Sequence, residues 1–87
     1  ESRDAAPTIR ALRAQAQGFS TEVQEKARRK LAAGEAPEAV MQFVADTLAN
    51  KMLHAPSAAL KRADADAQAL LLNAAHTLFD LPEENDH

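Results

Sequence analysis

The chain has 87 residues and a net charge of −3, with no cysteine, tryptophan or tyrosine and with twenty-one alanines. The lack of cysteine excludes disulfides, thiolate zinc ligands and thiol catalysis by this chain. β-Branched residues are few and good helix formers dominate, so the composition predicts an all-α fold.

Large apolar side chains are scarce. Of the forty apolar residues, twenty-one are alanines and nineteen are large: ten Leu, three Val, three Phe, two Met and one Ile. A core of that size stabilises so small a domain only marginally. We therefore expect a partner chain to supply part of the missing burial.

The charges are unevenly distributed along the chain. Residues 1–34 carry seven basic and four acidic side chains, residues 35–63 carry three of each, and residues 64–87 carry six acidic and no basic ones. Such polarity can orient two helices or two chains against each other. By itself it does not indicate nucleic-acid binding.

The sequence contains no targeting or membrane signal. No run of eighteen apolar residues is present, so we expect no transmembrane helix. The first residues, Glu1-Ser2-Arg3-Asp4, are unlike a signal peptide and lack an initiator Met. The expectation is a processed or excised segment of a cytoplasmic protein.

The first predicted helix runs from about Asp4 to Ala33. Pro7 lies in its first turn, where a missing N–H costs nothing, and Gly34 ends it. Such a helix is about 45 Å long, longer than a compact body of this size, so we expect it to link to another part or to pack on another subunit. Its apolar face comprises Ile9, Leu12, Ala16, Phe19, Val23, Ala27 and Leu31.

A second helix is predicted to begin at Pro37. The short connection from Gly34 to Ala36 makes the two helices an antiparallel hairpin. The apolar arc of the second helix is wider than one neighbour needs, which predicts contact with two neighbours. This arc comprises Val40, Met41, Phe43, Val44, Leu48, Met52, Leu53 and Ala55.

Beyond the hairpin, Pro56 is predicted to interrupt the second helix and to start a short helical run ending near Ala63. A last helix is expected to begin with Asp66 as its N-cap and to end near Asp80. Residues 83–87 are expected to be a disordered acidic tail, which leaves one domain over residues 1–82. The apolar residues of the last helix are Leu70, Leu71, Ala74, Leu78 and Phe79.

Candidate catalytic and metal-binding residues are isolated from one another. His54, His76 and His87 are scattered without a partner at helical spacing. The acidic residues Asp64, Asp66 and Asp80 are better explained as caps and solvated helix ends than as paired carboxylates. Enzymatic activity, bound metal and bound cofactor are therefore not expected of this chain alone.

One basic run has two explanations. Lys26, Arg28, Arg29 and Lys30 form either a solvated helix face or a weak contact to RNA phosphates. No aromatic side chain interleaves the run, which favours the solvated face. Salt-dependent RNA binding would distinguish the two.

The segment Asn50-Lys51-Met52-Leu53-His54-Ala55-Pro56-Ser57, with Leu60-Lys61 after it, carries a resemblance to a known family. It resembles the Asn-Lys-Leu-Leu-His-x-Pro-Thr signature in the C-terminal dimerisation domain of glutamyl-tRNA reductase. The similarity extends to Ile9-Arg10-Ala11-Leu12-Arg13 and to Leu78-Phe79-Asp80-Leu81, and so covers about residues 5–81. Met52 and Ser57 depart conservatively from the signature.

The resemblance implies a domain that joins two subunits into a V-shaped homodimer, here as a dimeric helical bundle. The parent enzyme would reduce glutamyl-tRNA to glutamate-1-semialdehyde with NADPH, on the route to 5-aminolevulinate and tetrapyrroles. Its nucleophilic cysteine and its NADPH-binding Rossmann domain have no counterpart in this chain. Glutamyl-tRNA and NADPH would therefore bind elsewhere in the parent.

Two rival functions are a stand-alone RNA-binding module and a monomeric protein adaptor. Asn50 and His54 are candidates for polar contacts that fix a buried junction. Phe43→Asp or Leu48→Asp is predicted to dissociate or unfold the protein. The residues predicted to be buried within or between subunits are Phe19, Val23, Val40, Phe43, Val44, Leu48, Met52, Leu53, Leu70, Leu71 and Leu78.

Overall fold

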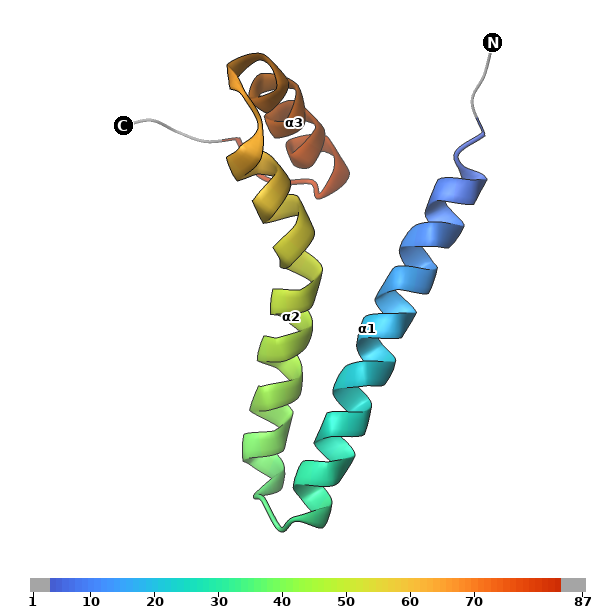
Figure 1. The fold of residues 1–87 in the computed structure, drawn as a ribbon, viewed down its shortest axis with the longest axis vertical. Coiled ribbons are helices and arrows are strands. Elements are labelled where there is room, and N and C mark those ends of the chain that lie inside the picture. The colour runs from blue at the N-terminus through green and yellow to red at the C-terminus, as the bar shows by residue number, and fades with distance from the viewer. Residues whose placement is uncertain (1–3, 84–87) are drawn as a thin grey trace. The chain divides into compact units, whose positions relative to one another are not determined.

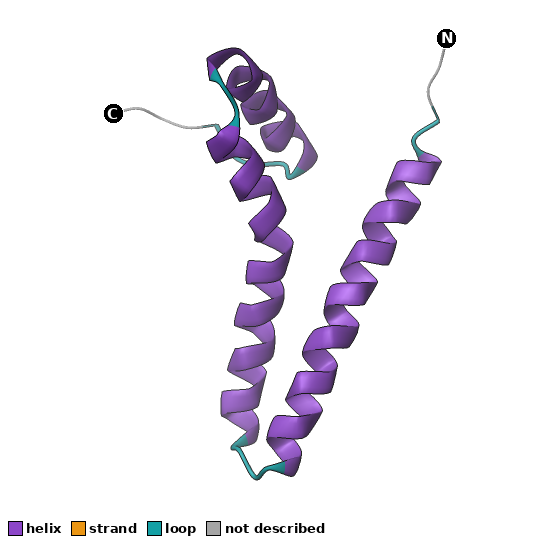
Figure 2. Ribbon diagram, viewed as in Figure 1, coloured by secondary structure: helices purple, strands orange, loops and turns teal. Residues whose placement is uncertain are grey.

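The computed structural model describes residues 4–83. It contains three helices, α1 (Ala6–Ala32), α2 (Pro37–Arg62) and α3 (Ala65–Leu78), and no strand occurs between residues 4 and 83 (Figures 1 and 2). The predicted all-α class is confirmed. The chain divides into two compact units, Glu1–Leu53 and His54–His87, with α2 continuing from the first into the second.

Helix α1 is delimited by residues that the sequence identifies. The Asp4 carboxylate accepts a hydrogen bond from the Ala6 N–H at 3.0 Å, and Pro7 follows in the first turn. At the other end Gly34 has φ +92°, and its N–H bonds to the Leu31 carbonyl while the Glu35 N–H bonds to that of Lys30. This pair of bonds is a Schellman motif, which reverses the chain directly into α2.

The two glycines predict opposite effects of substitution by alanine. A Cβ at Gly34 meets no atom within 4 Å, but its positive φ makes Gly34→Ala cost about 1–2 kcal/mol of folding stability. Gly18 also has open space around it but lies inside α1, so Gly18→Ala is expected to add about 0.5–1 kcal/mol. Urea unfolding of the two variants tests this. A change in the free energy of unfolding that has the same sign in both variants would contradict it.

The core of the first unit lies near the reversal. Val23 is 1% exposed, Ala27 8% and Val40 4%, and these three are the fully buried apolar residues among those described. Val23 and Ala27 are one turn apart on α1, and Val40 lies at the start of α2. Figure 1 shows α1 and the adjoining part of α2 running antiparallel from the connection. The predicted hairpin is confirmed.

In the second unit, two predictions about helix boundaries are wrong. Pro56 does not interrupt α2, which runs unbroken to Arg62 and has no separate helix after it. Proline removes one N–H donor and strains the preceding turn, but a helix held on both sides of it can continue. The N-cap of α3 is Asp64, not Asp66: its carboxylate accepts from the Ala67 N–H at 2.9 Å, and Asp66 lies in the first turn.

Helix α3 closes with a second reversal. Phe79 is its C-cap and Asp80 has φ 51°, while the Leu81 N–H bonds to the His76 carbonyl at 3.0 Å. The predicted end near Asp80 is therefore confirmed. The Gln68 amide also donates to the Leu60 carbonyl at 3.0 Å, which ties α3 to the end of α2. Residues 84–87 of the predicted tail lie outside the described residues.

Candidate interaction surface

Most large apolar side chains of a single chain remain in contact with solvent. Twelve of the nineteen are at least 37% exposed, and Leu70 and Leu78 are 72% and 74% exposed. Apolar exposure on this scale marks surfaces that another molecule covers. The twelve are Ile9, Leu12, Leu31, Met41, Met52, Leu53, Leu70, Leu71, Leu72, Leu78, Phe79 and Leu81.

One side of the α1–α2 hairpin is closed by charged side chains. The Lys51 ammonium lies 2.7 Å from the Glu22 carboxylate and 5.8 Å from the centre of the Phe19 ring. These residues join the two helices across twenty-nine positions of sequence. Through the ion pair and the cation–π contact, the alkyl chain and ammonium of Lys51 cover the Phe19 ring.

A second lysine repeats this arrangement nearer the connection. The Lys30 ammonium lies 4.7 Å above the centre of the Phe43 ring and 3.6 Å from the Glu35 carboxylate. Both phenylalanines are half-buried. We call this side of the hairpin the clasped face, and it comprises Phe19, Glu22, Lys30, Glu35, Phe43 and Lys51.

The Glu22–Lys51 pair predicts a pH dependence of stability. The hydrogen bond and the charge of Lys51 hold the pKa of the Glu22 carboxyl below its ordinary value of 4.5. A lowered pKa adds stability that is complete above pH 4.5 and is lost as the pH falls through the lowered value. The Glu22 side chain is 62% exposed, so the effect is small and screened by salt.

The variant Glu22→Gln removes this titration. Its unfolding midpoint in urea is expected to lie below that of the parent chain at pH 7 and to approach it as the pH falls to 3. Thr21→Gln, at an exposed neighbouring position, serves as the control. A gap between Glu22→Gln and the parent that is constant with pH would show that the ion pair contributes nothing.

The opposite side of the hairpin is apolar and open. Near the connection, a hollow is lined by Ala27, Leu31, Val40, Met41 and Val44, together with Pro37 and Ala45. Almost all of its lining is carbon. No charged side chain belongs to it, in contrast to the clasped face.

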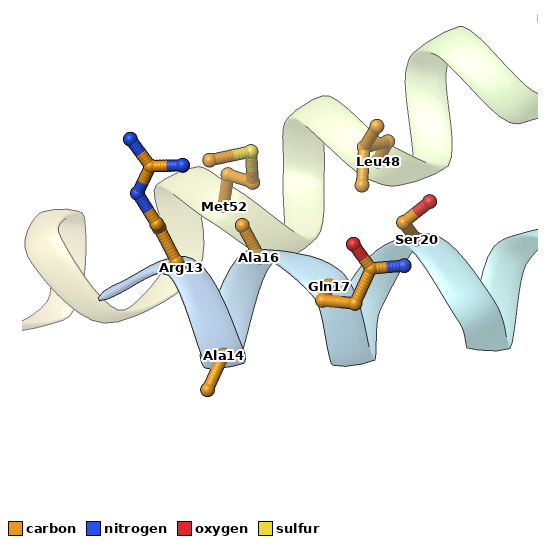
Figure 3. Close-up of a pocket in the computed structure, with 7 residues that line it drawn as sticks. All are labelled: Arg13, Ala14, Ala16, Gln17, Ser20, Leu48 and Met52. Atoms are coloured by element: carbon orange, nitrogen blue, oxygen red, sulfur yellow. The ribbon is translucent and has the colours of Figure 1, made fainter. Parts of the chain in front are cut away.

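A second hollow lies on the same side of the hairpin, farther from the connection. Figure 3 shows Ala16 and Ser20 of α1 facing Leu48 and Met52 of α2, with Arg13 at the edge. The lining residues are Arg13, Ala14, Ala16, Gln17, Ser20, Leu48 and Met52.

Helical spacing places both hollows on one surface. On α1, Ala16, Ser20, Ala27 and Leu31 are four or seven residues apart. On α2, Met41, Val44, Leu48 and Met52 are three or four residues apart. Each set therefore forms one stripe along its helix. From residue 13 to residue 31 the surface is about 27 Å long. We call it the apolar face, and it comprises Ala16, Ser20, Ala27 and Leu31 of α1 with Met41, Val44, Leu48 and Met52 of α2.

The residues predicted to be buried fall into separate groups. Val23 and Val40 lie in the hairpin core, and Phe19 and Phe43 lie on the clasped face. The apolar face contains Val44, Leu48 and Met52. Exposed in a single chain are Leu53, Leu70, Leu71 and Leu78, whose burial between subunits stays a prediction.

The polar pair Asn50 and His54 is also exposed. Within residues 4–83, neither side chain makes a hydrogen bond. Their predicted role in fixing a junction between subunits stays a prediction. The sequence placed Met41 in the apolar arc of the second helix but not among the residues predicted to be buried, although its four- and seven-residue spacing from Ala45 and Leu48 put it on the same stripe.

The basic run does not form a one-sided patch. A helix turns by about 100° per residue, so Lys26 and Arg28 point about 160° apart. Lys30 is already paired with Glu35. The RNA contact stays a prediction, for which binding to tRNA must fall steeply with salt and be lost in Lys26→Ala/Arg29→Ala.

Residues 4–83 contain neither a cluster of metal ligands nor a membrane-spanning helix. In that range, no three His, Asp or Glu side chains gather in a way that could hold a metal ion. No helix formed by the described residues has the length and hydropathy needed to cross a bilayer.

Comparison with known proteins places the chain in a family. Residues 1–81 match the family described as glutamyl-tRNA(Glu) reductase, dimerisation domain. The chain is 42% identical over 79 residues to the glutamyl-tRNA reductase of Saccharophagus degradans and 37% identical over 86 residues to that of Aromatoleum aromaticum. The alignments cover 91% and 99% of this chain but only 19% and 21% of those relatives.

The chain thus spans about a fifth of the length of these relatives. A third relative, the glutamyl-tRNA reductase of Nitrosococcus oceani, is 40% identical over 80 residues, with 92% of this chain and 19% of the relative covered. No solved structure matches the chain. With the match to residues 1–81, the predicted resemblance is confirmed, and the chain belongs to the dimerisation-domain family of glutamyl-tRNA reductases.

Proposed function

We propose that this domain joins two copies of its parent protein by burying the apolar face of one hairpin against that of another. The observation that carries the proposal is the contrast between the two sides of the hairpin. Lysines cover the phenylalanines on the clasped face, whereas the apolar face leaves Leu31, Met41 and Met52 about half exposed or more. Membership of a dimerisation-domain family supports a second copy as the partner.

The parent protein is proposed to be a glutamyl-tRNA reductase, which uses NADPH to convert glutamyl-tRNA to glutamate-1-semialdehyde for tetrapyrrole synthesis. The relatives carry that name, and four-fifths of their length lies outside the match to this chain. The chain itself has no cysteine to act as nucleophile, and its two glycines are too far apart for a dinucleotide loop. The proposed task of this segment is assembly, with tRNA and NADPH held by other domains.

Light scattering of the 87-residue chain tests the assembly directly. A dimer has twice the 9.4 kDa mass of the chain, about 19 kDa, and should dissociate on dilution. A particle of 9.4 kDa at all concentrations up to about 1 mM, with full helical content, would contradict the proposal. Adding tRNA at physiological salt should leave the mass of the protein particle unchanged.

A further inference from the structure

Helix α2 passes from one compact unit of the chain into the other. The first unit ends at Leu53 and the second begins at His54, both inside the helix. Pro56 also lies inside α2, within one turn of that boundary. The helix that connects the two units therefore carries a proline at the place where one unit gives way to the next.

The proline weakens the helix at this turn. In an α-helix each N–H donates to the carbonyl four residues earlier, and the proline nitrogen has no hydrogen to donate. The Met52 carbonyl therefore lacks the bond that residue 56 would supply, and the proline ring crowds it. No side-chain donor within residues 4–83 replaces that bond. Helix α2 continues through the turn, but with one backbone hydrogen bond fewer.

The same turn has little packing around it within one copy. Four successive residues, from Met52 to Ala55, are exposed, and Ser57 is exposed as well. Because a helix turns by about 100° per residue, four successive side chains point to all sides of it. A helix that packs on a neighbour has a buried stripe, and these four residues contribute none. Backbone hydrogen bonds are therefore the main restraint on the direction of α2 at this turn.

The side-chain bonds that join helices lie inside one unit or the other. In the first unit, the Lys51 ammonium lies 2.7 Å from the Glu22 carboxylate and joins α2 to α1. In the second unit, the Gln68 amide donates to the Leu60 carbonyl at 3.0 Å and joins α3 to α2. Each unit has its own restraints on its own side of the proline, so the turn between them is the part of α2 that bends most easily.

We infer that α2 is hinged at residues 53–57, so that the units Glu1–Leu53 and His54–His87 change direction relative to each other as two rigid bodies. Bending at this turn breaks fewer hydrogen bonds than bending elsewhere in α2, because one bond is already missing. The α1–α2 hairpin is unchanged by the motion, since its ion pair lies before the hinge. The inference goes beyond the proposed homodimer and does not depend on it.

Residual dipolar couplings of the 87-residue chain test the hinge. The amide couplings of each unit are fitted to the structure of that unit alone. Units that move against each other should give alignment tensors of different magnitude, whereas a rigid α2 gives tensors of one magnitude for both. Helix α1 and the part of α2 before residue 53 are the internal control, because they belong to one unit and must share a tensor. Tensors of equal magnitude in the unsubstituted chain would overturn the inference.

The variant Pro56→Ala should remove the hinge. It restores the N–H that bonds to the Met52 carbonyl and replaces the poorest helix former with the best. The two tensors should become equal in magnitude. Exchange of the amide hydrogens of residues 57–59 should also slow by on the order of 10- to 100-fold.

Ser57→Ala is the matched control. It changes the next residue, which is also exposed, and raises the helix propensity without adding a backbone donor. Its two tensors should stay unequal. If Pro56→Ala leaves the tensors as unequal as Ser57→Ala does, the motion does not arise at the proline and the inference is overturned. Because each tensor is fitted to one unit, the comparison is the same for a monomer and for a dimer, and a monomeric mass by light scattering would overturn the homodimer alone.

Discussion

Leu48→Asp is expected to dissociate the dimer while the hairpin stays folded. Leu48 is half-buried and lines the apolar face rather than the Val23–Val40 core. Covering its remaining exposed half in the dimer contributes about 0.8–1.5 kcal/mol, and a buried unpaired carboxylate adds a desolvation cost of at least similar size. Because each dimer contains two such sites, the dissociation constant should rise at least about 100-fold. Light scattering gives the mass, and circular dichroism gives the helix content.

Ala39→Asp is the matched control for this variant. It places the same charge on the same helix, at an exposed site outside the apolar face. Its mass should be that of the unsubstituted dimer. If Leu48→Asp dimerises as tightly as Ala39→Asp, the apolar face is not the interface.

Val23→Asp is expected to unfold the hairpin itself. Val23 is 1% exposed, less than the other two residues of the hairpin core, Val40 at 4% and Ala27 at 8%. A carboxylate there lies in the centre of a three-residue core, at a cost that exceeds about 4 kcal/mol. So small a domain has little stability in reserve, since typical values are about 5–15 kcal/mol. Helical ellipticity should fall sharply at 25 °C.

The control is Gln15→Asp, at an exposed position of α1. A surface substitution of this kind changes the free energy of unfolding by less than about 1 kcal/mol. A Val23→Asp chain with the helicity and urea midpoint of Gln15→Asp would show that the α1–α2 contact is not the centre of the fold. Val23→Ala should lower the free energy of unfolding by about 2 kcal/mol, an effect between those of Gln15→Asp and Val23→Asp.

The positions of the helices follow from local signals. Gly34 can adopt the positive φ that ends α1, and Pro37 is suited to the first turn of α2. These two residues predict the hairpin without any tertiary information. The same local reasoning fails at Pro56, where the preference of one residue is outweighed by the helix on both sides. It also misses the Asp64 cap, because Asp64 and Asp66 are equally good capping residues.

The division of the hairpin into two faces is not predictable from spacing alone. The apolar arc on α2 indicated two neighbours, but not which residues would meet which. Lys51 and Glu22 are twenty-nine positions apart, so their pairing depends on how the two helices align. Phe19 and Phe43 are large and apolar, and only the structure places each of them near a lysine of the same chain.

The clasped face and the apolar face make the two sides of the hairpin chemically different. Charged side chains cover one side and keep it in water, so a partner gains little by displacing them. The other side offers small residues on α1 and long residues on α2, a combination that lets a second pair of helices approach closely. A two-fold partner satisfies both stripes at once because it brings its own α1 and α2.

Isotope-filtered nuclear Overhauser spectroscopy on a mixture of labelled and unlabelled chains detects only contacts between copies, and so identifies the face of the hairpin that forms the interface. We expect contacts between copies from the methyl groups of Met41, Leu48 and Met52. Methyl groups of Leu31 and Ala27 should also contribute. A spectrum in which the contacts between copies come only from Phe19 and Phe43, or only from α3, would contradict this expectation.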